Sequence, residues 1–333
     1  MTKISQFFGA CSIKCRATEP APTMIIFRLY KARNPDSSIT FTLLYPQEFD
    51  VSSVIRRFLL WWFDVPFSPW VCGNIVIDVT NTKKFLQNIN KKSNHHITLQ
   101  HVIAQSVSHA LQQVPEANAR IVGNKIQIIP NIGIAMPVNL IGHQAGQKNE
   151  LSMILLREAQ KKTILQIAKE TQKQKTEEQK GNIQSTFIRN LMRLAERTPN
   201  RLTKKILDGL DTISKHPQTS QKVFELFPAT TAITNPGSNH PRELEGVVYR
   251  GGSFHPPLRI AQIGTFWAIT GIQKEVLPIN GKPEVREVLP VMLTFDHRLI
   301  DGFKASKLLL AFSEALKDPQ EHIYLGAPDG SKY

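Results

Sequence analysis

The segment that most constrains the fold is a hairpin signal in the last quarter of the chain. Asn280-Gly281 joins two expected strands, over about 262–274 and 284–295. Asn and Gly both tolerate the positive φ angles of a two-residue hairpin turn, so this pair is the strongest hairpin signal in the sequence. The chain must therefore carry a long antiparallel strand pair at this point.

The second of these strands ends at a histidine. Asp296-His297-Arg298 follows the apolar run, and Asp301-Gly302 then opens an amphipathic helix through about Leu316. A neutral imidazole is well suited to take a proton near neutral pH, and the apolar strand supplies dry walls. His297 is therefore a candidate general base. The alternative is a surface histidine at a strand–turn–helix corner, with Asp301 acting only as the N-cap.

The amino-acid composition indicates which kind of protein this is and which kinds of partner it could bind. The 333 residues are 41% hydrophobic and carry a net charge of +14, as in a globular protein with anionic partners. Nucleic acid, an anionic membrane surface and a phosphate-bearing cofactor all fit that charge. Nucleic acid is not expected, because zinc-finger spacing and an aromatic-studded basic sheet motif are both missing. No stretch approaches the roughly 20 apolar residues of a spanning helix.

The cysteines and the first residues bear on the compartment. Cys11, Cys15 and Cys72 make no disulfide framework, so we expect a reducing compartment and a cytoplasmic protein. Residues 1–24 are basic and faintly like a transit peptide, which leaves an organellar location as the alternative. A leader or a start codon upstream of Met24 explains them equally well.

Periodicity and turn signals predict the remaining elements. The expected strands are Val71–Val79, Lys125–Ile129, Ile132–Pro137, Leu151–Leu156 and Thr230–Thr234. The expected helices run from Thr80 to about Asn90, over Leu99–Val114 and from Ile164 to about Lys180, with Thr80 and Thr98 as N-caps. The strands at 125–129 and 132–137 are expected to be neighbours. Further upstream we expect a hairpin within 24–45 and a short helix at Arg56.

Residues 184–226 read as a helical insertion with one basic face. Apolar residues recur at helical spacing on both sides of Thr198-Pro199-Asn200, which predicts a helical hairpin: Phe187, Leu191, Leu194, then Leu202, Ile206, Leu210. We favour an ordinary insertion that packs on the body. Contact with an anionic membrane, or a cover over a substrate entrance, stays open.

Six short segments, in order along residues 71–318, point to one family. They are NIVIDVT (74–80), VPEANA (114–119), NIGIAM (131–136), KKTILQIA (161–168), TAITNPG (231–237) and TFDHRLIDG (294–302). They resemble motifs of the dihydrolipoyl acyltransferase catalytic domain of 2-oxoacid dehydrogenase complexes. That domain shares its fold with chloramphenicol acetyltransferase. The resemblance implies an α/β sandwich, a mixed β-sheet covered by helices.

The resemblance also implies a function and a site. It implies CoA-dependent acyl transfer, with acyl-CoA as co-substrate and direct attack by the acceptor. His297 matches the family's general base, Thr234 a hydroxyl that donates to the oxyanion, and Asp301 an orienting aspartate. We expect a homotrimer or higher multiple, in which His297 and Thr234 meet across or near a subunit interface.

Three departures from the family pattern leave the acceptor open among a thiol, a hydroxyl and an amine. Residues 1–50 are expected to form an N-terminal extension, partly disordered in one interpretation, and 51–333 the catalytic domain. Nothing before the catalytic match looks like a lipoyl domain, so no covalently attached lipoyl group is expected on this chain. The helical insertion is foreign to the family, and residues 240–257 are irregular where the family has a regular motif.

Two further interpretations were weighed against catalysis. A catalytically idle relative could serve as an assembly subunit or a membrane-surface scaffold, although His297, Asp301 and Thr234 all being present argues against it. His95, His96 and His101 cluster near one helix start and could suggest a metal. They lack a carboxylate or cysteine partner, so we interpret them as a polar loop and helix face and expect no metal.

Overall fold

The computed structural model describes residues 68–93, 95–122, 125–140, 150–179, 190, 193–194, 196–235, 248–255 and 263–323. Within these ranges, side chains are not described at 138–140, 150–152 and 178–179. The expected N-terminal extension, the hairpin within 24–45 and the helix at Arg56 lie outside the described residues. No helix among the described residues is long and apolar enough to cross a bilayer.

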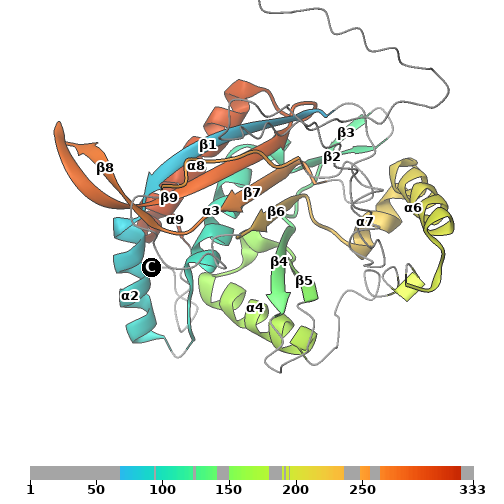
Figure 1. Ribbon diagram of the computed structural model, residues 1–333, viewed down its shortest axis with the longest axis horizontal. Helices are drawn as coiled ribbons and strands as arrows, with labels where there is room; N and C mark the ends of the chain where they lie inside the picture. The colour runs from blue at the N-terminus through green and yellow to red at the C-terminus, as the bar shows by residue number, and fades with distance from the viewer. Residues whose placement is uncertain are drawn as a thin grey trace, which may run out of the picture. The chain divides into compact units, whose positions relative to one another are not determined.

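A seven-stranded mixed sheet forms the centre of the described structure (Figure 1). Six strands follow the order β1-β9-β7-β6-β4-β5, and β8 pairs with β9 beside that path. β4–β6 and β6–β7 are parallel pairs, whereas the others are antiparallel. The strands are β1 (Trp70–Asp78), β4 (Ile134–Leu140), β5 (Glu150–Leu156), β6 (Thr231–Thr234), β7 (Thr265–Ile269), β8 (Gln273–Ile279) and β9 (Lys282–Asp296).

The expected hairpin is confirmed, but one of its strands is divided. Asn280 and Gly281 have φ angles of 50° and 76° and turn β8 into β9, as a hairpin with two left-handed residues requires. The single strand expected over 262–274 is wrong, because the chain breaks between β7 and β8. β9 is long enough to pair with β8 along its first half and with β7 along its second half.

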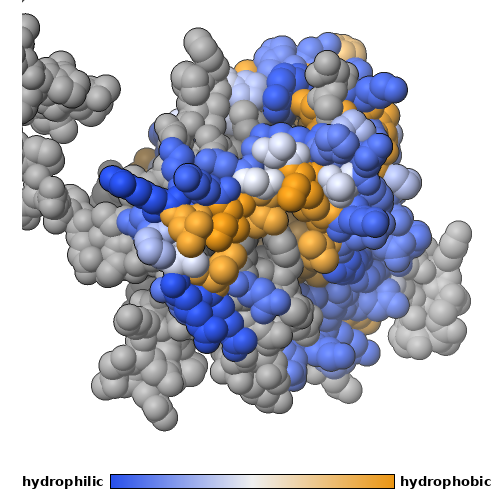
Figure 2. Space-filling model, turned by 90° about the vertical axis from the view of Figure 1, so that its right-hand side faces the viewer, coloured by the Kyte–Doolittle hydropathy of each residue, from blue (hydrophilic) through white to orange (hydrophobic). Residues whose placement is uncertain are grey.

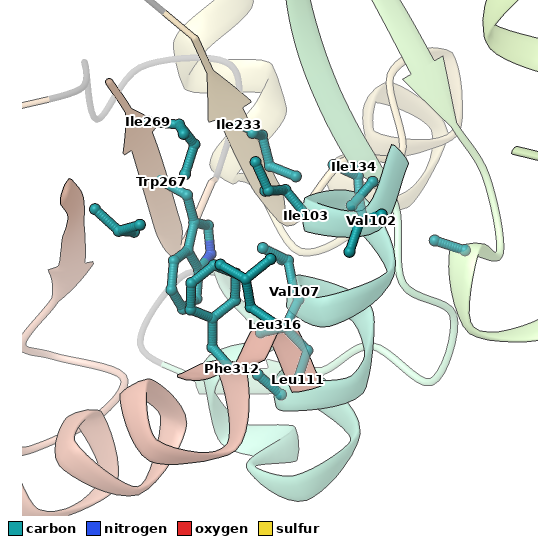
Figure 3. Packing of buried hydrophobic residues seen from close by; sticks show 14 of the residues in the cluster. Val102, Ile103, Val107, Leu111, Ile134, Ile233, Trp267, Ile269, Phe312 and Leu316 are labelled. Carbon is teal, nitrogen blue, oxygen red and sulfur yellow. The ribbon is translucent and has the colours of Figure 1, made fainter. Parts of the chain in front are cut away.

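Helices cover one face of the sheet and enclose the main core with it. These helices are α2 (Thr80–Lys92), α3 (Leu99–Gln113), α4 (Ile164–Gln179), α8 (Gly302–Lys317) and α9 (Pro319–His322). Figure 3 shows Trp267 and Ile269 of β7 and Ile233 of β6 pointing at α3 and α8. The rings of Trp267 and Phe312 lie 4.6 Å apart between their centroids. The predicted α/β architecture is thereby confirmed.

Two expectations about local structure need correction. Thr80 is the first residue of α2 and does not cap it; Asp78 accepts from the Thr80 N–H (2.9 Å) and hydroxyl (2.6 Å), because a carboxylate is the stronger acceptor. The strands expected at 125–129 and 132–137 are not neighbours. β3 (Lys125–Ile128) pairs instead with the unexpected β2 (Ala119–Val122) in a separate ribbon.

The insertion contributes α6 (Asn200–Lys215) and α7 (Ser220–Leu226). α6 confirms the second arm of the expected helical hairpin, while most of the first arm lies outside the described residues. Two short 3₁₀ turns, η1 (Pro115–Ala117) and η2 (Ala159–Lys161), join the remaining elements.

Candidate active site

His297 lies at the end of β9 with its ring open to solvent. Its backbone N–H donates to the Pro69 carbonyl (2.9 Å), which ties the residue to the segment leading into β1. The Phe295 ring lies 6.0 Å away, centroid to centroid. Within the described part of the chain the imidazole makes no hydrogen bond. A substrate can therefore reach it.

The two residues that flank His297 form an ion pair with each other, which holds the turn that carries the histidine. Arg298 donates from Nε (3.0 Å) and Nη2 (2.6 Å) to the two oxygens of Asp296, and its backbone N–H donates to the same carboxylate (2.9 Å). Asp296 is only 4% exposed. These hydrogen bonds raise the pKa of the Arg298 guanidinium. Sequence reasoning noted both charged residues beside His297 but gave neither a role. Two opposite charges at the end of an apolar strand were the signal that could have predicted this ion pair.

Asp301 caps the N-terminus of α8. Its Oδ1 accepts from the Lys304 N–H (2.9 Å), and the side chain is exposed. No hydrogen bond joins Asp301 to His297 among the described residues. The structure therefore shows the capping role that was the alternative interpretation, and contact with the imidazole stays a prediction.

Thr234 lies at the far end of β6, on the face of the sheet that points away from the core helices. Its neighbour Ile233 is buried in the main core, so the alternation of strand residues puts the half-buried Thr234 on the opposite face. The register pairs Thr234 with Ala268, and Ala268 with Met292.

His297 and Thr234 do not meet within one chain. β9 runs antiparallel to β7 (Figure 1). His297 therefore lies five residues beyond Met292, toward the end of the sheet opposite to Thr234. With about 3.4 Å per strand residue and about 4.8 Å per interstrand step, the two α-carbons are about 20 Å apart. Side chains of this size cannot bridge such a gap. If the two residues act together, they come from different copies of the chain.

The sheet face that carries Thr234 holds further polar groups near the His297 end. Ser68 Oγ and His255 Nδ1 lie 3.1 Å apart, next to the Pro69 carbonyl that holds His297. Cys72 Sγ lies 3.2 Å from the Thr294 hydroxyl. Sequence reasoning missed the Ser68–His255 contact, because it joins positions 187 residues apart.

Segment 248–255 lies over this face. Phe254 stacks on Phe266 of β7 at 4.4 Å between ring centroids, and Tyr249 Oη lies 3.6 Å from Met292 Sδ. Segment 248–255 therefore covers part of β7 and β9 on the side of the sheet opposite the core helices.

The histidine cluster does not form a metal site. His101 is 7% exposed, and its Nδ1 accepts from the Thr98 N–H (3.1 Å) at the start of α3, which confirms Thr98 as the N-cap residue. Burial, and secondarily the charge of His96, lower the pKa of His101 to about 4. Within the described residues no group of three or more His, Cys, Asp or Glu is arranged to hold a metal.

Comparisons with known proteins place these features in a family. The model of the 2-oxoacid dehydrogenases acyltransferase (catalytic domain) matches residues 68–190 and 220–324. The acetyltransferase component of the pyruvate dehydrogenase complex of Buchnera aphidicola is 27% identical over 256 residues, 73% of this chain and 49% of that protein. The succinyltransferase component of the 2-oxoglutarate dehydrogenase complex of Bartonella vinsonii is 24% identical, over 72% of this chain and 45% of that protein.

Solved structures agree on the fold. The cubic core of a pyruvate dehydrogenase multienzyme complex superposes with a TM-score of 0.55 at 16% identity, over 80% of this chain and 88% of that one. Azotobacter vinelandii dihydrolipoamide acetyltransferase gives 0.54 at 15% identity, over 80% and 86%. These likenesses confirm the predicted acyltransferase fold.

The chain spans about half the length of the curated relatives it matches. The family match nevertheless covers well over half of the chain itself, from the segment before β1 to the end of α9, and omits only residues 191–219 between its two parts. The chain therefore belongs to the 2-oxoacid dehydrogenase acyltransferase (catalytic domain) family.

Proposed function

We propose that this protein transfers an acyl group from acyl-CoA to a thiol, hydroxyl or amine acceptor, with His297 as general base. The observation that carries the proposal is the open imidazole at the end of β9, on a residue whose backbone N–H donates to the Pro69 carbonyl and which the Asp296–Arg298 pair flanks. A base must be reachable by the acceptor, as this ring is, and the backbone that carries the ring is held in place.

A relative supports the choice of residues. The Azotobacter vinelandii structure was part of an investigation of a serine, a histidine and an asparagine in the catalytic mechanism of that enzyme, the last two four positions apart. His297 and Asp301 have the same spacing, with aspartate in place of asparagine. We carry the histidine's importance over to His297, and Thr234 supplies the hydroxyl.

The proposed step needs no covalent enzyme intermediate. The acceptor gives its proton to the imidazole of His297 as its sulfur, oxygen or nitrogen attacks the thioester carbonyl. The resulting oxyanion accepts a hydrogen bond from the Thr234 hydroxyl. Collapse of the intermediate breaks the carbon–sulfur bond, and the imidazolium returns the proton to the CoA thiolate. The base is worth about 10²–10⁴ in rate and the oxyanion donor about 10²–10³.

This chemistry requires more than one copy of the chain. Since His297 and Thr234 lie about 20 Å apart in one chain, we propose a homotrimer or higher multiple with each site between two copies. The similarity to a cubic core agrees with assembly. Scattered Lys and Arg would hold the CoA phosphates, in keeping with the net charge of +14.

The acceptor and the location complete the proposal. A dihydrolipoyl group is the acceptor that the curated relatives' names suggest, and it would be presented by a separate domain or chain. We propose a cytoplasmic location, or an organellar one if residues 1–24 act as a transit peptide. Contact with an anionic membrane is argued separately below.

Turnover of a panel of acyl-CoAs with dihydrolipoamide, alcohol and amine acceptors tests the proposal. The wild type should transfer acyl groups, and His297→Ala should lose at least about 100-fold in kcat while keeping its fold and oligomeric mass. Full activity of His297→Ala would contradict the role of the base. A wild type inactive with every pair would instead favour the idle-scaffold alternative.

A further inference from the structure

Helix α6 is an addition to the family's catalytic domain, because it lies within the segment 191–219 that the family match omits. Arg120 of the β2–β3 ribbon anchors the helix that follows. Its guanidinium donates to the Ser220 carbonyl (3.1 Å) and to Gln221 Oε1 (2.7 Å). It also lies 4.5 Å above the centre of the Phe224 ring. The added helix therefore joins the body at a defined corner.

Helix α6 packs on the body through Leu207, which is 1% exposed, yet leaves two other large aliphatic residues open. Thr203 and Ser214 are buried, whereas their neighbours Leu202 and Ile213 are 48% and 46% exposed. Leu202 and Ile213 are eleven residues apart, which is three turns of helix, so they lie on one side within about 20°. An amphipathic helix normally buries its large aliphatic residues and exposes its hydroxyls. Within the described part of the chain, the apolar side of α6 is thus left open at Leu202 and Ile213.

Cations border the stripe formed by Leu202 and Ile213. Arg201 and Lys205 lie one turn apart on the adjacent side of α6, and no ion pair is recorded for either in the described structure. Between 193 and 226 the described acidic residues are Glu196, Asp208, Asp211 and Glu225, and Asp211 pairs with Lys215 (2.6 Å). The exposed cations of the same stretch are more numerous: Arg193, Arg197, Arg201, Lys204, Lys205, Lys215 and Lys222. Figure 2 views the molecule from the side on which α6 and α7 lie and shows apolar surface bordered by hydrophilic surface.

We propose that α6 is a docking helix for an anionic lipid surface. Leu202 and Ile213 would enter the boundary between headgroups and acyl chains, while Arg201 and Lys205 pair with lipid phosphates. The proposal is independent of acyl transfer, since none of these residues belongs to the site around His297.

The spacing of the stripe favours lipid over a protein partner. Leu202 and Ile213 lie about 16 Å apart along the helix axis, and Gly209 lies between them with no atom within 4 Å of where a Cβ would be. A protein interface concentrates its binding energy in a central pocket filled by large anchors. A headgroup layer accepts separated aliphatic side chains without a complementary shape. A second copy of α6 would bring a like-charged surface against the stripe.

Sedimentation of the full-length protein with lipid vesicles tests this proposal. One set of vesicles is phosphatidylcholine alone, and the other contains phosphatidylcholine and phosphatidylglycerol in equal parts. The wild type should bind the anionic vesicles and not the neutral ones. Leu202→Ser and Ile213→Ser should each weaken binding about 10-fold. Arg201→Glu combined with Lys205→Glu should weaken it at least 25-fold, at about 5-fold for each lost cation.

Leu310→Ser is the matched control, since Leu310 is a 59% exposed leucine on the unrelated helix α8. It should bind the vesicles like the wild type. A wild type that ignores anionic vesicles overturns the proposal. An equal loss of vesicle binding in Leu202→Ser and Leu310→Ser also overturns it. A third contradicting result is loss of binding in the Arg201→Glu, Lys205→Glu variant while Leu202→Ser and Ile213→Ser still bind like the wild type. A change of oligomeric mass in Leu202→Ser would assign the stripe to contact between copies instead.

Discussion

Protonation of one buried histidine should set much of the acid sensitivity of this protein. His101 is almost fully buried at the start of α3, and its ring nitrogen accepts a hydrogen bond from the Thr98 N–H. A protonated ring could not accept that bond and would carry a charge into the core. Burial therefore lowers its pKa from 6.5 to about 4.

The sign and size of the effect follow from linkage. Above pH 6.5 the ring is neutral in both states, so its contribution to the free energy of unfolding is constant. Between pH 6.5 and 4 the unfolded chain takes up a proton that the folded chain refuses, and stability falls as the pH falls. A difference of about 2.5 pKa units corresponds to about 3 kcal/mol lost by pH 4.

His101→Gln isolates this contribution, because glutamine keeps a neutral acceptor at the third helical position and has no proton to gain. Urea unfolding of both proteins should give free energies within about 1 kcal/mol at pH 7.5. Toward pH 4 the wild type should lose about 3 kcal/mol more than the variant. The carboxylates that titrate in this pH range are the same in both proteins, so their effects cancel in the difference. Equal loss of stability in the two proteins as the pH falls to 4 would therefore refute the reasoning.

Two other predictions concern the turn at His297 and close backbone packing. Arg298→Met leaves the buried Asp296 without its partner. We expect urea unfolding to show a loss of about 1–3 kcal/mol in the free energy of unfolding. We also expect kcat to fall while KM does not rise, and an unchanged kcat would contradict the role of the ion pair. Gly133→Ala would put a Cβ 1.7 Å from the Pro228 carbonyl oxygen and should lower Tm strongly, whereas Gly209→Ala has open space and should raise stability by up to about 1 kcal/mol. Equal Tm shifts in the two would disprove the packing argument.

The sequence predicted those parts of the fold that depend on local signals. The turn at Asn280-Gly281, the cap at Asp301 and the helices α3 and α4 follow from residue chemistry and periodicity over a few neighbours. β2 was missed because a four-residue strand carries little pattern, and β3, although expected as a strand, was given the wrong neighbour because pairing depends on distant segments. The break between β7 and β8 was missed because it depends on how β9 divides its length between two partners.

The candidate site was only partly accessible to the sequence. Motifs identified His297, Thr234 and Asp301, yet their separation follows from strand register, which depends on pairing between distant segments. The Ser68–His255 contact depends on the same long-range pairing. Likewise, the apolar spacing of α6 predicted a helix but could not show which side of it is buried.

The most direct test of the account is whether one site draws its residues from two copies of the chain. His297→Ala and Thr234→Ala are each expected to be nearly inactive as pure proteins. After equal amounts are unfolded and reassembled together, random mixing places an intact His297 opposite an intact Thr234 in about a quarter of the sites of a closed ring. The account predicts recovery of about a quarter of wild-type kcat, while a mixture no more active than the two separate variants would contradict it.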